Sequence, residues 1–464
     1  MARIAGIERG NANAVVDQML DKVSYQDPVH REVIETRNAT LGVVFTEFEK
    51  PFATYLQKQS TVRDGMGGHF AQAQATDKSF RLMRDAAGVA PLYYGITKKE
   101  EWCFASEVKS LMTVTYDIRE FPPGHLFDGI ELNSWSAFRE DKLHNDSPNI
   151  IVEELRKILQ TVVIESINEA TGDVGVLLSG GVDSAAIAAL ASSFLNNRIH
   201  TFTIGLPDAP DLQAAREVAD YIGTTHHNLI VSRDELIEYL PEVIWHLESF
   251  DALLVRSSVL HYLIAKMASD YVPIIMVGEG ADELFAGYPN HKEIQLSRLP
   301  AVLLDSLRNM HNESLQRVDR CGIAHGLTNA VPYLDPRLAT FSLGIPPELK
   351  VCNGISKWCL REAMAEMIPS SLLNRPRAKF WNSGGVDEML AEWARESITF
   401  EELTKEQYLP NGWRIDSREE LLYYRIFHDH FGKIAEDPTW IGRTIGAPIE
   451  IQKQDVKQSI SSGF

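Results

Sequence analysis

The pattern of hydrophobic and polar positions divides the chain into two unlike parts. Up to about residue 145, short segments rich in β-branched and aromatic residues alternate with polar or glycine-rich turns, among them TLGVVFTEFE, ATYLQKQSTV, EWCFASEV and HLFDGIEL. This pattern predicts a β-rich domain. The polar stretch DKLHNDSPN then precedes an amphipathic helix, IVEELRKILQTVVIESI. We therefore expect a first domain at 1–145 and a second that begins at 146.

The second part alternates buried strands with helices. VGVLL, IHTFTIGL and VPIIMVG are continuous apolar runs, and AAIAALASSFL and AAREVADYIG between them are typical of helices. This order predicts an α/β fold with a doubly wound parallel sheet, in which ligands bind beyond the carboxyl ends of the strands. From about Pro300 the pattern is mainly helical. We expect this domain to cover 146–445 and a loose tail to cover 446–464.

Composition and charge narrow the classes of partner. The 464 residues carry 45 Lys and Arg against 64 Asp and Glu, a net charge of -19, which repels phosphate backbones and anionic membranes. Nucleic acid and membrane are therefore not expected partners. No apolar run reaches the roughly 18 residues that a membrane span needs, and the start, MARIAGIERG, has no signal-peptide pattern. A cytoplasmic protein is expected, with its oligomeric state open, a homodimer included.

The segment GVLLSGGVDSAAIAALA carries the clearest chemical signal. A strand delivers Ser179, Gly180 and Gly181 to a turn, and a helix starts near Asp183 and Ser184, so backbone amides and the positive end of a helix face one point. Such a loop suits a phosphate. The segment lacks the GK[ST] of Walker A loops. SGGVDS instead resembles the loop of N-type ATP pyrophosphatases, which cleave ATP between its α- and β-phosphates.

A second acidic element, GEGADELFAGY, follows the VPIIMVG strand. Asp183 and Asp282 would then project from the ends of two strands of one sheet, an arrangement that suits Mg²⁺ bound to a triphosphate. Taken singly, each acid also fits the first turn of a helix, where it would act as a cap. The pair favours a metal site.

Successive motifs of the chain resemble those of the asparagine synthetase B family, which includes β-lactam and carbapenam synthetases. The matching segments, in order, are RLMRDAAGVAPLYYG, FASEVKSLM, FPPGHLF, LLSGGVDSA, IHTFTIG, FDALLVRSS, VGEGADELFAGY, DRCGIAHGL, VPYLDPRL and SKWCLREAM. The resemblance implies an N-terminal Ntn-type αββα-like glutaminase domain and a synthetase domain that adenylates a carboxylate for an amine to attack. It also implies ATP and Mg²⁺ as cofactors, with a small carboxylate and an amine or ammonia as substrates.

The resemblance assigns roles to matching positions. Arg256 occupies the place of an arginine near the amino-acid substrate, although a helical arginine is otherwise solvated or ion-paired. Glu279 is assigned a catalytic role. For the remaining positions, the resemblance implies ATP binding by Leu177, Ser179, Gly180, Gly181, Asp183, Ser184, Ile204 and Gly278, and metal binding by Asp183 and Asp282.

The N-terminal part departs from the family pattern. Glutaminases of this type use an N-terminal cysteine, exposed by removal of Met1, as the nucleophile. This chain has Ala2 there. The family segments HRGPD and NGEIYN are also missing. We therefore expect a reduced, degenerate glutaminase domain that does not hydrolyse glutamine.

The synthetase part departs as well. In GLTNAVPYLD, Thr328 stands where the asparagine-forming members have a glutamate, and we expect it to alter the acceptor pocket. The family lysine that stabilises charge during amide formation falls on Arg377, with Lys379 two residues further on, so both are catalytic candidates.

The sequence therefore predicts an AMP-forming, ATP-dependent amide ligase without its own glutamine hydrolysis. The alternatives are an ammonia-fed asparagine synthetase, an intramolecular lactam-forming synthetase, and a catalytically silent nucleotide-binding module.

Overall fold

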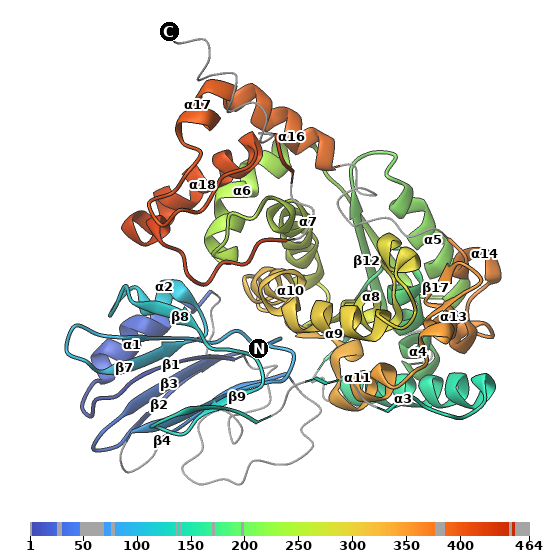
Figure 1. Ribbon diagram of the computed structural model, residues 1–464, viewed down its shortest axis with the longest axis horizontal. Coiled ribbons are helices and arrows are strands. Elements are labelled where there is room, and N and C mark those ends of the chain that lie inside the picture. The colour runs from blue at the N-terminus through green and yellow to red at the C-terminus, as the bar shows by residue number, and fades with distance from the viewer. Residues whose placement is uncertain are drawn as a thin grey trace.

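The computed structural model describes residues 2–25, 30–46, 69–75, 79–135, 138–139, 142–168, 172–195, 199–375, 386–444 and 448–450. Its N-terminal part contains two antiparallel sheets, with orders β2-β3-β1-β7-β6-β8 and β10-β9-β5-β4 (Figure 1). Their strands are β1 (Arg3–Ile7), β2 (His30–Glu35), β3 (Thr40–Phe45), β4 (Ala71–Ala75), β5 (Phe80–Arg84), β6 (Tyr93–Ile96), β7 (Trp102–Ala105), β8 (Ile118–Glu120), β9 (His125–Phe127) and β10 (Leu132–Ser134).

The two sheets pack on each other and helices cover one outer face. Phe80 of β5 and Phe104 of β7 meet edge to face between the sheets, with ring centroids 4.9 Å apart. On the opposite side of β3, a Cβ on Gly42 would touch Val16 and Leu20 of helix α1 (Asn13–Asp21). The short helix α2 (Val108–Leu111) follows β7. Among the described residues this is the β-rich domain in reduced form that the sequence predicts; the predicted strand ATYLQKQSTV lies outside them.

The second part contains a five-stranded parallel sheet of order β13-β12-β11-β14-β15, which confirms the predicted doubly wound fold (Figure 1). Its strands and the helices between them are α3 (Pro148–Asn168), β11 (Val174–Leu177), α4 (Val182–Leu195), β12 (His200–Gly205), α5 (Pro210–Ile222), β13 (Thr225–Ile230), α6 (Arg233–Leu247), α7 (Ala252–Ser269), β14 (Ile274–Met276), α8 (Ala281–Phe285), α9 (Leu299–Asn309), α10 (Ser314–Ile323) and β15 (Thr328–Ala330). The strand order reverses between β11 and β14, the place where open α/β sheets bind ligands.

The chain continues as helices after β15, as predicted, apart from a two-stranded hairpin. The hairpin is β16 (Val351–Cys352) and β17 (Ile355–Ser356). The helices are α11 (Pro336–Leu343), α12 (Pro347–Lys350), α13 (Trp358–Met364), α14 (Ser370–Leu373), α16 (Val386–Ser397), α17 (Phe400–Lys405) and α18 (Arg418–Phe431), with the 3-10 turns η3 (Pro332–Leu334) and η4 (Gly432–Glu436). Two further 3-10 turns, η1 (Pro289–Glu293) and η2 (Met310–Asn312), lie before β15, between α8 and α10.

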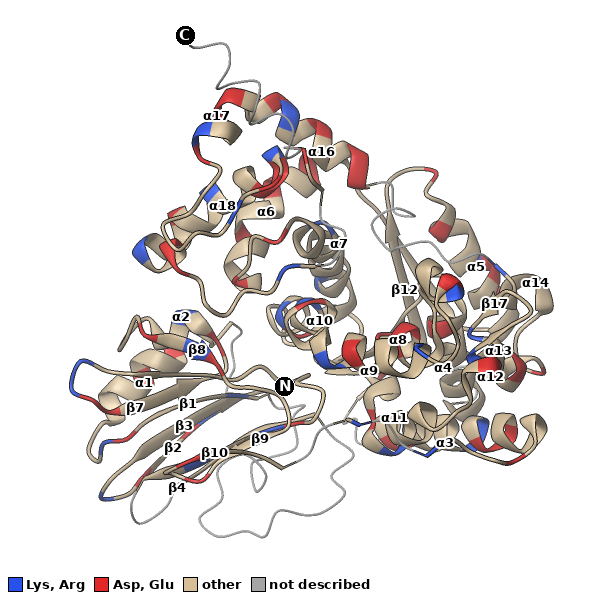
Figure 2. Cartoon of the chain, in the orientation of Figure 1, with Lys and Arg blue, Asp and Glu red and all other residues tan. Residues whose placement is uncertain are grey.

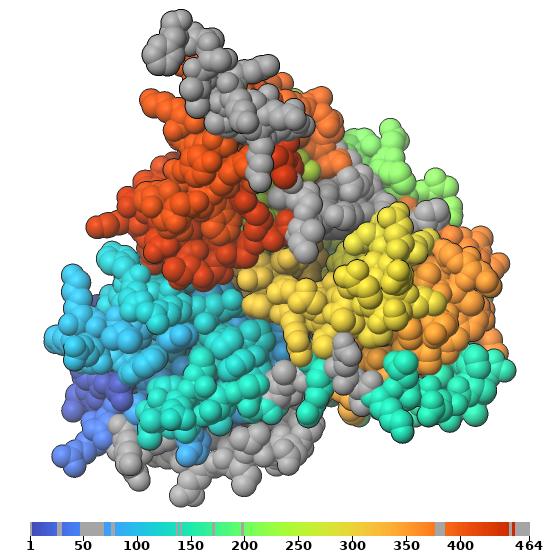
Figure 3. Space-filling view, viewed as in Figure 1, coloured from blue at the N-terminus to red at the C-terminus, as the bar shows by residue number. Residues whose placement is uncertain are grey.

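Residues of the predicted first domain contact the second part at two places. In Figure 3 the red C-terminal part of the chain lies directly against the cyan part of the N-terminal region. The hydroxyl of Thr439 donates to the carbonyl of Ile118 at 2.6 Å. The Nε2 of His144, in the predicted linker, donates a hydrogen bond to the carbonyl oxygen of Phe341 on α11, 2.9 Å away. The boundary between 145 and 146 stays a prediction, and the predicted tail lies mostly outside the described residues.

Charge is spread over the surface rather than gathered in a basic band. Figure 2 shows Asp and Glu along the outer helices α16 and α17, as the net charge of -19 leads one to expect. In the part of the chain that the structure describes, the helices are all too short or too polar to cross a bilayer.

Candidate active site

The loops that follow β11 and β14 lie against each other at the reversal point of the sheet. A Cβ built on Gly278, after β14, would stand 3.2 Å from the backbone nitrogen of Ser184 and 3.3 Å from the Cβ of Asp183. A larger residue at 278 would therefore push the two loops apart. The fold thus brings SGGVDS and GEGADE, which are about a hundred residues apart in sequence, into one site.

Hydrogen bonds of two serine hydroxyl groups fix the conformation of the loop after β11. Ser184 Oγ accepts from the backbone nitrogen of Ser179 at 3.1 Å and lies 3.2 Å from Ser179 Oγ. Gly180 has φ of 72°, and a Cβ there would meet the backbone of Ala214 at 2.8 Å, so the turn needs glycine. Helix α4 begins at Val182, with its N-terminal amides beside the loop. This geometry fits the predicted phosphate cradle.

Lys357 joins the two predicted metal-binding acids. Its Nζ lies 2.5 Å from Asp183 Oδ2 and 2.6 Å from Asp282 Oδ1, and the lysine side chain is almost fully buried. The two carboxylates therefore point at one place. Lys357 has φ of 57° and precedes α13, and its backbone nitrogen donates to Phe285 O at the end of α8. A non-glycine residue in this left-handed region is a feature that functional sites often retain.

Lys357 stands in the SKWCLREAM segment, but nothing in the sequence pattern gives it this role. The close packing behind it also involves Gly287, where a Cβ would fall 1.8 Å from Asp282 Oδ1 and 2.1 Å from Lys357 Cε. Only the missing side chain at 287 leaves room for the pair.

Two further cations line the same region. Arg375 donates to Ser179 O at 3.3 Å and to Asp211 Oδ1 at 2.8 Å, which ties the phosphate loop to the chain before α16. Arg361, on α13, is partly buried, and burial lowers the pKa of its guanidinium below the usual value, although it stays a cation at neutral pH. The predicted catalytic residues Arg377 and Lys379 lie outside the described residues.

The cavity at this site has a volume of about 820 Å³, within the range of sites for small molecules. Gly180 supports the loop without lining the cavity. The predicted residues that line it are Leu177, Ser179, Gly181, Asp183, Ser184, Ile204, Gly278, Glu279 and Asp282.

The far side of the cavity is formed by α7, α9 and α10. Arg317 on α10 forms an ion pair with Glu279, with NH2 donating to Oε1, and both residues line the cavity. His261 on α7 also lines it, and its Nε2 has no hydrogen-bond partner among the described residues. Burial, with a smaller effect from Arg317, lowers the pKa of His261 well below 6.5, so the imidazole is neutral. Sequence reasoning missed both Arg317 and His261.

Two predicted substrate residues do not reach the cavity. Arg256 is held by Glu419 of α18, with Nε donating to Oε1 at 2.7 Å and NH2 donating to Oε2. Thr328 pairs with Ile274 at the amino end of β15, whereas Ala330 pairs with Met276 at the carboxyl end near the site. Neither lines the cavity. Their substrate roles, and the altered acceptor pocket expected from Thr328, stay predictions that the lining of this cavity does not support.

Comparisons with known proteins match this arrangement. Residues 154–305 and 295–413 match the family model described as asparagine synthase, and residues 44–113 match a glutamine amidotransferase domain. The chain is 29% identical to asparagine synthetase B of Escherichia coli (strain K12), over 83% of this chain and 74% of the relative. It is 32% identical to the glutamine-hydrolyzing asparagine synthetase of Zea mays, over 79% of this chain and 66% of that relative.

A third relative and one solved structure complete the comparison. The glutamine-hydrolyzing asparagine synthetase of Pongo abelii is 32% identical, over 82% of this chain and 76% of the relative. The structure of NMN synthetase from Francisella tularensis covers 65% of this chain at 14% identity with a TM-score of 0.30, a slight likeness. On the strength of the family model and the sequence relatives, the chain belongs to the asparagine synthetase family.

Proposed function

We propose that this protein is an ATP- and Mg²⁺-dependent ligase that forms an amide bond and releases AMP and pyrophosphate. The observation that carries the proposal is the meeting of Asp183 and Asp282 on Lys357, next to the glycine turn after β11. A glycine turn alone is common, but two acids and a buried cation around it make a site for a charged, metal-bound triphosphate.

In the first step a substrate carboxylate attacks the α-phosphorus of ATP, and the bond to the β-phosphate oxygen breaks. The departing pyrophosphate carries negative charge that the site must stabilise. Lys357, Arg361 and the N-terminal amides of α4 are the described groups that would do so. The products of this step are an acyl-adenylate and pyrophosphate.

In the second step an amine attacks the acyl carbon, AMP leaves, and the amine loses a proton. Glu279 is the carboxylate that faces the cavity next to Arg317, so it is our candidate to accept that proton. Lys379 stays a second candidate from the sequence.

Mg²⁺ fits the two carboxylates because it binds proteins through one or two acids and completes its shell with water and phosphate oxygens. Groups of three or more metal-binding side chains are not found among the described residues, so an all-protein metal cage is not what this site offers. Asp183 and Asp282 would hold the ion, which neutralises phosphate charge when bound.

We further propose that the N-terminal domain does not hydrolyse glutamine, because Ala2 offers no nucleophile at the start of β1. The amine would then be ammonia, a second substrate or a group on the same molecule. Incubation with glutamine and measurement of released glutamate tests this: glutamate formed in step with pyrophosphate would overturn it.

The ligase proposal is tested by following pyrophosphate release from ATP and Mg²⁺ with a panel of carboxylic acids, with ammonia and other amines present. Acid-dependent release is expected, and Asp183→Asn should abolish it. The panel includes aspartate, since asparagine among the products would identify an ammonia-fed asparagine synthetase. Nucleotide binding without turnover across the panel would favour a silent binding module instead.

A further inference from the structure

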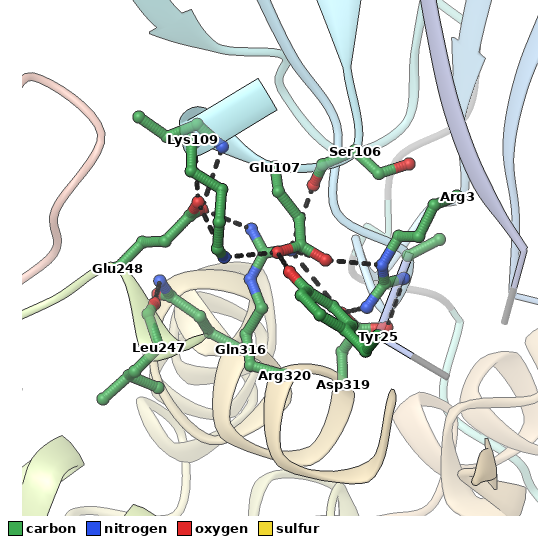
Figure 4. A network of polar contacts seen from close by, with 12 residues as sticks. Arg3, Tyr25, Ser106, Glu107, Lys109, Leu247, Glu248, Gln316, Asp319 and Arg320 are labelled. Atoms are coloured by element: carbon green, nitrogen blue, oxygen red, sulfur yellow. Dashed lines mark hydrogen bonds and ion pairs between the residues drawn. The ribbon is translucent and has the colours of Figure 1, made fainter. Parts of the chain in front are cut away.

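Six charged side chains meet in the contact between the two domains (Figure 4). Each is at most 2% exposed, and three are cations and three are anions. They are Arg3, Glu107, Lys109, Glu248, Asp319 and Arg320. Because an unpaired charge in such a place is very costly, each member needs at least one partner of opposite charge.

Arg3 lies at one edge of this cluster and reaches across the domain contact (Figure 4). Its Nε donates to Glu107 Oε1 at 2.7 Å within the N-terminal domain. Its two terminal nitrogens donate to the carboxylate of Asp319 on α10, at 3.2 Å and 2.6 Å. A planar guanidinium that binds a carboxylate through two parallel hydrogen bonds fixes orientation as well as distance.

Arg320, also on α10, joins the rest of the cluster. It donates to Ser106 O at 3.1 Å and to Glu248 Oε2 at 2.9 Å, and it lies 3.2 Å from Glu107 Oε1. Glu248, at the end of α6, accepts from the backbone nitrogens of Val108 and Lys109 at 2.9 Å and 2.8 Å, and so caps α2 across the contact. Lys109 Nζ lies 2.5 Å from Glu107 and 3.1 Å from Glu248. Lys109 therefore belongs to the same cluster but makes no bond to α10.

Helix α10 connects this cluster to the cavity. Asp319 and Arg317 are two positions apart, which places them on opposite sides of a helix that turns about 100° per residue. Asp319 accordingly meets Arg3 on the N-terminal side, while Arg317 forms the ion pair with Glu279 in the cavity. The rotation and position of α10 decide where the Arg317 side chain holds Glu279.

We propose that Arg3 and Asp319 are positioning residues for the ligase, an inference that rests on the proposed function. Through α10 they set the place of Arg317 and so of Glu279, the carboxylate proposed to accept the proton of the amine. The first strand of the N-terminal domain, which follows Ala2, thus serves the synthetase site. We expect their effect at Glu279 and not at the loop after β11, since that loop has its own ties through Lys357 and Arg375.

The test compares Arg3→Met with a control variant, Lys109→Met. The control removes an equally buried cation from the same cluster but leaves both bonds between Arg3 and Asp319 in place. Hydrogen exchange of the segments 278–281 and 314–320 is measured without substrates. We expect exchange about tenfold faster in Arg3→Met and unchanged in Lys109→Met. Because no turnover is needed, failure of the ligase assay would leave this measurement standing.

Kinetics then supply the second measurement. In the pyrophosphate-release assay, Arg3→Met should raise the KM for the acceptor amine or lower kcat by about tenfold, while the KM for ATP stays the same. This is the effect expected when one group, here Glu279, is slightly misplaced. Arg3→Lys, which keeps the charge, should recover part of the loss. If Arg3→Met does not fold, Arg3→Met combined with Asp319→Met removes both charges and is expected to show the same faster exchange. Equal behaviour of Arg3→Met and Lys109→Met would overturn the proposal.

Discussion

The ammonium nitrogen of Lys357 lies 2.5 Å from a carboxylate oxygen of Asp183, although 174 positions separate the two residues in the chain. A single cation between Asp183 and Asp282 holds the two carboxylates close together before any ligand binds. The site therefore keeps one net negative charge at this point, which favours a divalent cation. This lysine is as central to the proposed chemistry as the acids are.

Replacing Lys357 by Met should lower the rate of pyrophosphate release by about 100-fold or more, the usual effect of removing one group that stabilises developing charge. Circular dichroism should show a folded protein. Lys157→Met, which removes an exposed lysine on α3, is the matched control and should keep full activity. A Lys357→Met protein with near wild-type release would contradict a role for this cation in catalysis.

Gly287→Ala should abolish pyrophosphate release because its Cβ would overlap Asp282 Oδ1 and Lys357 Cε. The displaced side chains can shift, so we expect a folded protein with a damaged site. Gly412→Ala is the control: it has φ of 87° and no atom within 4 Å of the added Cβ, so it should lose about 1 kcal/mol of stability and no activity. Nucleotide binding by titration calorimetry would separate loss of binding from loss of chemistry.

Acid should destabilise the protein as the pH falls below about 6.5. Burial, with help from Lys109, lowers the pKa of His246 to about 3, and burial lowers the pKa of His325 to about 4. Between these values and 6.5 the unfolded chain binds more protons than the folded one. The free energy of unfolding therefore decreases as the pH is lowered. Urea titrations at pH 7, 6, 5 and 4 measure this slope.

The variant His246→Phe should flatten that slope, because it removes one buried imidazole that must stay neutral. His30→Gln, on the exposed strand β2, should leave the slope as it is in wild type. A His246→Phe protein with an unchanged slope would show that this imidazole does not contribute to acid sensitivity.

A chain limited to residues 146–464 should not fold into a soluble protein. It would lose the partners of Glu248, Asp319 and Arg320, and it would expose to water the apolar side chains that share one core cluster with the N-terminal part. Co-expression of residues 1–145 should restore soluble protein. A cooperative unfolding transition in the isolated second part would contradict this expectation.

The sequence predicts the parts of the site that one strand and one loop determine. SGGVDS after a buried strand is enough to place a glycine turn at Gly180, and the alternation of strands and helices is enough to predict the parallel sheet. The sheet then brings Asp183 and Asp282 together, because loops at the carboxyl ends of neighbouring strands share an edge.

The sequence does not predict contacts that depend on side-chain packing between distant helices. Lys357 reaches the acids only through a left-handed backbone and the room left at Gly287. Arg256 lies in a motif that suggests substrate binding, yet Glu419 of α18 takes its guanidinium. Thr328 stands in a motif next to the site but at the wrong end of its short strand, a difference that motif spacing cannot resolve.

The bond between Arg3 and Asp319 also sets an order of events during protein synthesis. At about 5–20 residues per second, the 316 positions that separate them take the ribosome roughly 15–65 s. For that time the first strand has left the ribosome while its partner helix does not yet exist. The contact between β1 and α10 can therefore form only after most of the chain has been made, and a nascent chain that stalls before α10 would present unmatched charges to chaperones and proteases.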